Sequence, residues 1–221
     1  MTHSFDKAYW QQHWQQTHAG RPGSMAGNPP NPYLARETAG LAPGTALDAG
    51  CGAGAEAIWL ASRGWQVTAA DISADALAHA AVRAAASGPT GPIRWVEADL
   101  TGWEPGRRFD LVTTHYAHPA MPQLAFYQRI CDWVAPGGTL LIVGHLHTSQ
   151  GNGHDHGHGH GHGHGHGHPA EATVTLADIT TGLDEADWEV VTAEEHQRPI
   201  PGPGGQPVTL HDVVVRATRR R

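Results

Sequence analysis

Short apolar runs alternate along the chain with longer segments in which apolar residues recur every three to four positions. The short runs predict buried strands, and the longer segments predict helices. The expected strands lie at 46–49, 65–70, 93–96, 109–114 and 139–143. The expected helices lie at 55–63, 74–86 and 121–134. Strands that alternate with helices favour right-handed crossovers and a parallel sheet covered by helices on both faces.

The two ends of the chain depart from this alternation. Residues 188–192 and 208–215 are typical of two strands with no helix between them, so we expect them to pair antiparallel at one edge of the sheet. Residues 5–18 carry aromatic side chains spaced by four, which predicts a helix. We expect residues 1–43 to form a helical lid and residues 44–221 to form one α/β domain.

A histidine occupies every second position in one internal segment, mostly with glycine between. Because such a low-complexity segment cannot bury a core, we expect a disordered Gly/His-rich insertion at about 148–170. Neutral imidazoles at this density bind nickel, zinc, copper or cobalt without any fold, but a flexible repeat offers no fixed coordination site for catalysis. The candidate metal ligands are His154, His156, His158, His160, His162, His164, His166 and His168.

Composition and charge exclude several classes of function. The formal net charge is −7 with His neutral, and the only basic cluster is residues 219–221. A nucleic-acid partner is not expected, because such proteins need clustered Lys and Arg. No apolar stretch reaches the ~18–20 residues that span a bilayer, and the first residues do not resemble a signal peptide. With two cysteines there is no disulfide framework, and we expect a soluble, cytoplasmic protein with no membrane partner.

The residues from Asp48 to Gly54 read Asp-Ala-Gly-Cys-Gly-Ala-Gly at a predicted strand-to-helix turn. Glycines there let the backbone approach a ligand closely and expose amides at a helix N-terminus. The pattern also fits a relaxed dinucleotide fingerprint, G-x-G-x-x-A. Asp71 follows Gly50 by 21 residues at the end of the next strand, where a carboxylate would accept the ribose hydroxyls of either kind of nucleotide.

Three features favour a nucleotide that carries a cation. Asp48 precedes the glycines, and no Lys or Arg lies near the turn to neutralise a pyrophosphate. Asp99 ends the third strand, where it would reach an adenine amino group. Ligands bind at the carboxyl ends of the strands in such sheets, and Asp48, Asp71, Asp99 and His115 all fall there.

In these segments the sequence resembles the class I S-adenosylmethionine-dependent methyltransferases. Residues 47–54 resemble their first motif, 70–73 their ribose-binding turn, 97–100 their adenine-binding loop and 136–141 their turn into the fifth strand. The resemblance implies a Rossmann-like seven-stranded sheet in the order 3-2-1-4-5-7-6, with strand 7 antiparallel and helices on both faces. It also implies S-adenosylmethionine as cofactor, held by the candidate residues Trp14, Asp48, Gly50, Cys51, Gly52, Asp71, Ile72, Asp99, Leu100 and His115.

Within this class, residues 9–14 are similar to the start of the thiopurine and tellurite-resistance methyltransferase group. In that group the second Trp of the motif contacts the cofactor, which implies the same role for Trp14. A Trp face attracts a sulfonium through cation–π interaction, most strongly in a dry pocket. The Gly-His insertion is not part of the group's pattern.

Methyl transfer is an in-line displacement in which the enzyme mainly aligns the reactants and excludes water, so no obligatory catalytic residue follows from it. Residues 114–118 follow the fourth strand and would face the methyl group. Tyr116 and His118 are the candidates to take a proton or to orient a small-molecule acceptor. A soft sulfur, selenium or tellurium nucleophile would need no base, and we expect an acceptor of this kind.

Two other functions stay open on the sequence. A metal-binding or buffering protein would use the Gly-His tract and carry a secondary or inactive methyltransferase domain. A nicotinamide-dependent oxidoreductase would bind a dinucleotide at the glycine turn. The second of these is disfavoured, because the positive charge that would face the phosphates is missing.

Overall fold

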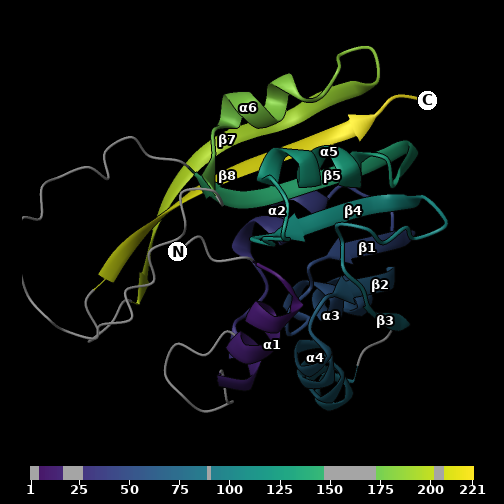
Figure 1. The fold of residues 1–221 in the computed structure, drawn as a ribbon. Coiled ribbons are helices and arrows are strands. Elements are labelled where there is room, and N and C mark those ends of the chain that lie inside the picture. The colour runs from purple at the N-terminus through teal and green to yellow at the C-terminus, as the bar shows by residue number, and fades with distance from the viewer. Residues whose placement is uncertain (1–4, 17–26, 89–90, 147–172, 202–206) are drawn as a thin grey trace, which may run out of the picture.

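The computed structural model describes residues 5–16, 27–88, 91–146, 173–201 and 207–221 (Figure 1). One mixed sheet has the strand order β3-β2-β1-β4-β5-β8-β7, with a short β6 beside β5. The strands are β1 (Thr45–Ala49), β2 (Gln66–Asp71), β3 (Ile93–Glu97), β4 (Phe109–His115), β5 (Val134–Leu146), β6 (Thr173–Val174), β7 (Trp188–Pro201) and β8 (Pro207–Arg219). The predicted order is confirmed: β7 and β8 are its sixth and seventh strands, and β8 is antiparallel to β5.

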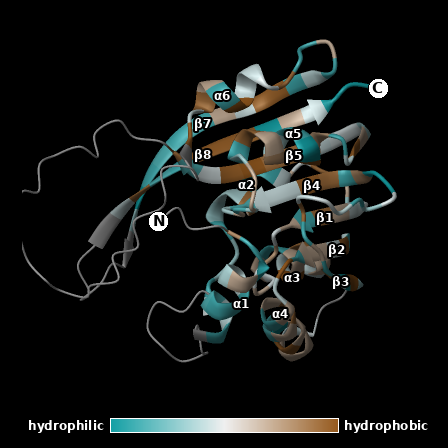
Figure 2. Cartoon of the chain, in the orientation of Figure 1, coloured by the Kyte–Doolittle hydropathy of each residue, from teal (hydrophilic) through white to brown (hydrophobic). Residues whose placement is uncertain are grey.

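The central strands are buried on both faces, which explains their continuous apolar runs. In β5, Leu140 and Ile142 belong to one core cluster, whereas Leu141 and Val143 belong to another. Figure 2 shows hydrophobic residues along β5 and much of β8, in contrast to the largely hydrophilic α1. Since neighbouring side chains of a strand point to opposite faces, these two clusters mark the two faces of the sheet.

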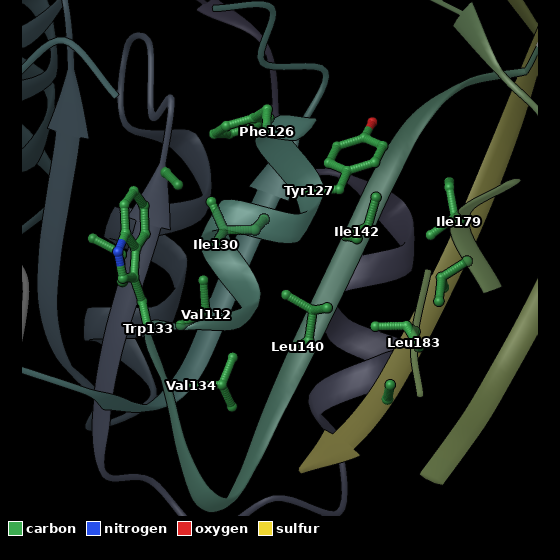
Figure 3. Packing of buried hydrophobic residues seen from close by; sticks show 14 of the residues in the cluster. Val112, Phe126, Tyr127, Ile130, Trp133, Val134, Leu140, Ile142, Ile179 and Leu183 are labelled. Carbon is green, nitrogen blue, oxygen red and sulfur yellow. The ribbon is translucent and has the colours of Figure 1, made fainter. Parts of the chain in front are cut away.

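Helices cover both faces, and all but α1, which packs on α4, bury apolar side chains against the strands. They are α1 (Lys7–Gln16), α2 (Pro32–Thr38), α3 (Ala55–Ser62), α4 (Ala74–Ser87), α5 (Gln123–Cys131) and α6 (Leu176–Thr181). Leu34 of α2 and Leu60 of α3 pack on one face of the sheet. Phe126 and Ile130 of α5 pack on the other face, together with Ile179 of α6 (Figure 3).

The sequence placed some boundaries wrongly and missed three elements. The predicted helix at 121–134 ends at Cys131, because Val134 already pairs with Phe109 at the start of β4. Strand β5 therefore begins before the Gly137-Gly138 turn, and its register with β4 shifts there. The short elements α2, β6 and α6 were not predicted. No helix in the described ranges is long and apolar enough to cross a membrane.

Candidate cofactor and acceptor site

The glycine turn between β1 and α3 is shaped by backbone conformations that favour glycine. Gly50, Gly52 and Gly54 have φ of 80°, 49° and 73°. The amides of Gly50 and Cys51 both donate to the carbonyl of Ala70 at the end of β2, at 2.8 and 3.0 Å. A Cβ at position 50 would lie 2.3 Å from the Cβ of Ala117. The turn is therefore fixed between β2 and the loop that follows β4.

Asp71 lies at the end of β2 and supports this turn. Its carboxylate accepts hydrogen bonds from the amide of Gly52 at 2.8 Å and from the amide of Ser73 at 2.9 Å. Burial raises the pKa of Asp71, and these backbone hydrogen bonds partly offset that effect. Ile72 follows it and is half-buried. The carboxylate predicted to bind the ribose is thus held beside the glycine turn.

Asp48 lies in β1 directly before the glycines and is only 1% exposed. Its Oδ2 has no hydrogen-bond partner among the described residues. Burial raises the pKa of Asp48 well above its usual range, and the negative charges of Glu56 and Asp71 raise it further. None of these three carboxylates forms an ion pair within the described part of the chain. Three carboxylates therefore influence one another here, and no cation of the described residues pairs with them.

Asp99 lies just beyond β3, as predicted, and its side chain is exposed. Its Oδ1 accepts from the amide and the hydroxyl of Thr101, at 2.9 and 2.7 Å. The next residue, Leu100, is buried in the core. The amide of Ala98 donates to the carbonyl of Asp71 at 2.9 Å, which joins this loop to the end of β2. The two acidic residues predicted to bind the nucleoside therefore lie on adjoining strand ends.

Trp14 connects α1 to the glycine turn and is 5% exposed. It clusters with Ala53 and Ala76, and a Cβ at position 52 would lie 3.0 Å from its ring. The side-chain Nε2 of Gln11 donates to the carboxylate of Asp75 at 2.6 Å, which holds α1 beside α4. Trp14 thus lies against the glycine turn, and its contact with the cofactor, which the resemblance implies, stays a prediction. The role of residues 1–43 as a lid stays a prediction.

Cys51 and His115 are both buried near the turn. Burial raises the pKa of the Cys51 thiol, and the charges of Asp71 and Asp48 add to the effect, so the group stays protonated. Burial lowers the pKa of His115, although the charge of Glu56 opposes this shift, so its imidazole is neutral near pH 7. Its Nε2 has no hydrogen-bond partner among the described residues. Cys51 is therefore a packed thiol, and its burial and raised pKa disfavour a role as a nucleophile.

Tyr116 and His118 follow β4 but are held in different ways. Tyr116 has φ of 56°, which is uncommon outside glycine, and its hydroxyl donates to Asp212 at 2.7 Å. His118 has its Nδ1 3.1 Å from Oε1 of Gln123, and its carbonyl accepts from Nε1 of Trp10. The ring of His145 stacks on both side chains, with centroids 4.5 Å from Tyr116 and 5.5 Å from His118.

Four residues of this region were missed by sequence reasoning: Tyr33, His145, Arg198 and Asp212. One signal for Asp212 was available, since it is a carboxylate at the edge of the apolar run Val213-Val214-Val215 of a predicted strand. Such a carboxylate needs partners if it is buried. No spacing in the sequence points to the other three.

The Gly-His tract lies outside the described residues, so its eight predicted metal ligands stay a prediction. Within the described ranges, no group of three or more His, Cys, Asp or Glu side chains is arranged to hold a metal ion.

Comparison with known sequences finds similar proteins for the part of the chain that forms β1 to β4 and the start of β5. Residues 46–138 match the family described as a methyltransferase domain. An uncharacterized methyltransferase of Mycobacterium bovis is 40% identical over 108 residues, which are 48% of this chain and 53% of that protein. "Probable thiol methyltransferase 2" of Arabidopsis thaliana is 29% identical over 137 residues, which are 60% of this chain and 59% of that one. The chain thus spans about half the length of the curated relatives it matches.

Comparison with solved structures extends the likeness to nearly the whole chain. Magnesium protoporphyrin IX methyltransferase of Synechocystis, solved with bound S-adenosylmethionine, has a TM-score of 0.66 and 16% identity, covering 99% of each chain. At this identity the likeness concerns the fold. Residues 46–138 thus match a methyltransferase domain, and the chain as a whole has the fold of this solved methyltransferase.

Proposed function

We propose that this chain transfers a methyl group from S-adenosylmethionine to a small-molecule acceptor, with the cofactor at the carboxyl ends of β1 to β4. The observation that carries the proposal is the pair of buried carboxylates Asp48 and Asp71 with the half-buried Glu56 near them, none of which forms an ion pair within the described residues. S-adenosylmethionine brings positive charge on its sulfur and its amino group, which these carboxylates would balance. A pyrophosphate would be repelled by the same carboxylates.

The residues present fit this cofactor in three further respects. Asp71 would accept hydrogen bonds from the ribose hydroxyls, and Asp99 would accept a hydrogen bond from the adenine amino group. The glycine turn has the left-handed backbone that glycine allows, and the ring of Trp14 lies directly against it at Gly52, so the turn and Trp14 would contact the same ligand. Trp14 would shield the site from water and face the sulfonium. The cofactor supplies a methyl group already activated by the positive sulfur.

The acceptor we propose is a soft nucleophile of the sulfur, selenium or tellurium type. Such a nucleophile reacts without a general base. This agrees with the side chains that follow β4, since the hydroxyl of Tyr116 already donates to Asp212 and the ring of His118 contacts Gln123. Tyr116 and His118 then serve to orient the acceptor. A relative named as a thiol methyltransferase is consistent with this choice.

Calorimetry tests the cofactor part of the proposal. S-adenosylmethionine and S-adenosylhomocysteine are titrated into about 50–100 µM protein, where a Kd near 10 µM gives a measurable signal. We expect heat from both ligands and none from nicotinamide dinucleotides. Binding of a dinucleotide alone would replace the proposal with an oxidoreductase.

Methyl transfer from labelled S-adenosylmethionine tests the acceptor part. The panel comprises thiols, thiopurines, tellurite, selenite and arsenite, with phenols and amines of similar size as controls. We expect label in the sulfur, selenium or tellurium products. Label confined to phenols or amines would contradict the soft-nucleophile proposal while leaving the methyltransferase activity intact.

A further inference from the structure

A buried carboxylate on β8 gathers side chains from three distant parts of the chain. Asp212 is 0% exposed. It accepts from Nε of Arg198 on β7 at 2.7 Å, from the hydroxyl of Tyr116 at 2.7 Å and from the hydroxyl of Tyr33 on α2 at 3.0 Å. These four residues are called the Asp212 cluster below. An ionised carboxylate at such a position is stable because a cation and two hydroxyls surround it.

The guanidinium of Arg198 uses only one of its edges within the Asp212 cluster. Its Nε donates to Asp212, and its Nη2 donates to the hydroxyl of Tyr116 at 3.1 Å. Of the five N–H donors of an arginine, the other three have no partner among the residues that the structure describes. They include the Nη1–Nη2 end, the fork that binds planar anions in bidentate fashion. The side chain as a whole is 30% exposed, so it is not sealed in the core.

The Asp212 cluster lies beside the proposed cofactor site, at the same end of the sheet, where the parallel strands have their carboxyl ends. Tyr116 directly follows β4, and the next residue, Ala117, packs against Gly50 of the glycine turn. His145, near the end of β5, pairs with Asp212 across the sheet and stacks its ring on Tyr116. The Asp212 cluster therefore lies on the side of the turn away from Asp71 and Asp99, where an acceptor would meet the methyl group.

The conformation of Tyr116 adds an independent sign of function. A tyrosine with positive φ is strained by about 1 kcal/mol or more, and such strain concentrates at ligand sites. Here the strained backbone brings the hydroxyl between Asp212 and Arg198. The hydroxyl accepts from Nη2 of Arg198 and so fixes the orientation of the guanidinium plane. A contact that only balanced the charge of Asp212 would not require a fixed orientation.

We propose that Arg198, oriented by Asp212 and Tyr116, binds an acidic group of the methyl acceptor, so that the preferred acceptor is an anionic small molecule. This inference rests on the proposed function, because it names the class of substrate for that site. A lysine could neutralise Asp212 as well, but only a guanidinium offers a second, planar fork toward the acceptor. Asp212 and Tyr116 are positioning residues, and Arg198 contacts the substrate.

The first test compares three thiols of nearly equal size and different charge: thioglycolate, mercaptoethanol and cysteamine. We expect kcat/KM to be highest for thioglycolate, about 10–100-fold above mercaptoethanol, because a charge-assisted bidentate pair contributes that much discrimination. Cysteamine should be the poorest acceptor. Equal kcat/KM for the three thiols, or a preference for cysteamine, would overturn the proposal.

A binding measurement separates this inference from the proposed function. Saturation-transfer NMR detects methylthioacetate and its neutral amide with S-adenosylhomocysteine present, and needs no turnover. We expect signal from the anion and little from the amide. If calorimetry shows no cofactor binding but the anion still binds, the proposed function fails and the anion site stands. If the cofactor binds and neither compound gives signal, the anion site is wrong.

Variants assign the effect to Arg198. Arg198→Gln should remove the preference for thioglycolate and leave the affinity for S-adenosylhomocysteine unchanged. Arg198→Lys should restore only part of it, because the charge remains and the fork is lost. Arg94→Gln, on the exposed side of β3, is the matched control and should behave as wild type. If Arg198→Gln does not fold, the double variant Arg198→Gln/Asp212→Asn keeps the Asp212 cluster neutral; a retained preference there would refute the inference.

Discussion

Asp48 and Asp212 are both buried carboxylates at the end of the sheet where the parallel strands have their carboxyl ends, but their surroundings differ. Asp212 is surrounded by a guanidinium and two hydroxyls. Asp48 has an oxygen without a hydrogen bond among the described residues and lies near two further carboxylates. The first arrangement stabilises the fold, whereas the second destabilises it until a cation arrives. The contrast separates a carboxylate whose charge the protein itself balances from one whose charge the proposed cofactor would balance.

The largest expected effect comes from removing Asp212. Asp212→Ala should lower the free energy of unfolding by about 3–5 kcal/mol, because the change leaves Arg198 without its partner in a partly buried site. Urea denaturation followed by circular dichroism measures this change. A loss below about 1 kcal/mol would mean that the Asp212 cluster does not support the fold.

The second effect concerns cofactor affinity. Asp71→Ala should weaken S-adenosylhomocysteine binding about 100-fold, because two charge-assisted hydrogen bonds to the ribose are lost. Calorimetry measures it. Asp110→Ala is the control, since that exposed carboxylate lies at the opposite end of the sheet, where it accepts from Thr45. Equal losses in the two variants would contradict the assignment.

Asp48→Asn should have effects of opposite sign on stability and on binding. Without ligand, the variant should gain about 1–2 kcal/mol in free energy of unfolding at pH 7, because burial of a carboxyl group with a raised pKa costs free energy at any pH above its ordinary pKa. Its affinity for S-adenosylmethionine should fall about tenfold. Thermal unfolding and calorimetry on the same samples measure both. A loss of stability would show that the carboxylate is balanced after all.

The smallest expected effect is on the pH dependence of binding. Burial raises the pKa of Asp48 and Asp71, so the ligand-free protein keeps these protons to a higher pH than an unfolded chain does. Its stability therefore falls as the pH rises from the ordinary carboxyl pKa to the raised one. A cationic ligand favours the ionised forms, so its binding should release protons and strengthen over the same range. Calorimetry in two buffers of different ionisation enthalpy detects this release, which Asp48→Asn should reduce.

The half of the site formed by β1 to β3 was predictable, because each element carries its own local signal. The glycines follow one apolar run, and Asp71 and Asp99 end the next two. The Asp212 cluster was not predictable, because its members come together only through the pairing of β5, β8 and β7. Asp212 is 96 residues from Tyr116 and 179 from Tyr33. Hydropathy specifies that these strands exist, but not which residue of one lies beside which residue of another.

The contact between Gly50 and Ala117 has a consequence for how such proteins diversify. A larger residue at position 50 would displace the loop that carries Tyr116, so the two segments are interlocked. Substitutions that change the choice of acceptor are therefore restricted at Gly50 and Ala117. They have more freedom on β7 and α2, from which Arg198 and Tyr33 reach the Asp212 cluster that we propose to bind the acceptor. New specificities would accordingly accumulate on those elements while Gly50 and Ala117 stay constant.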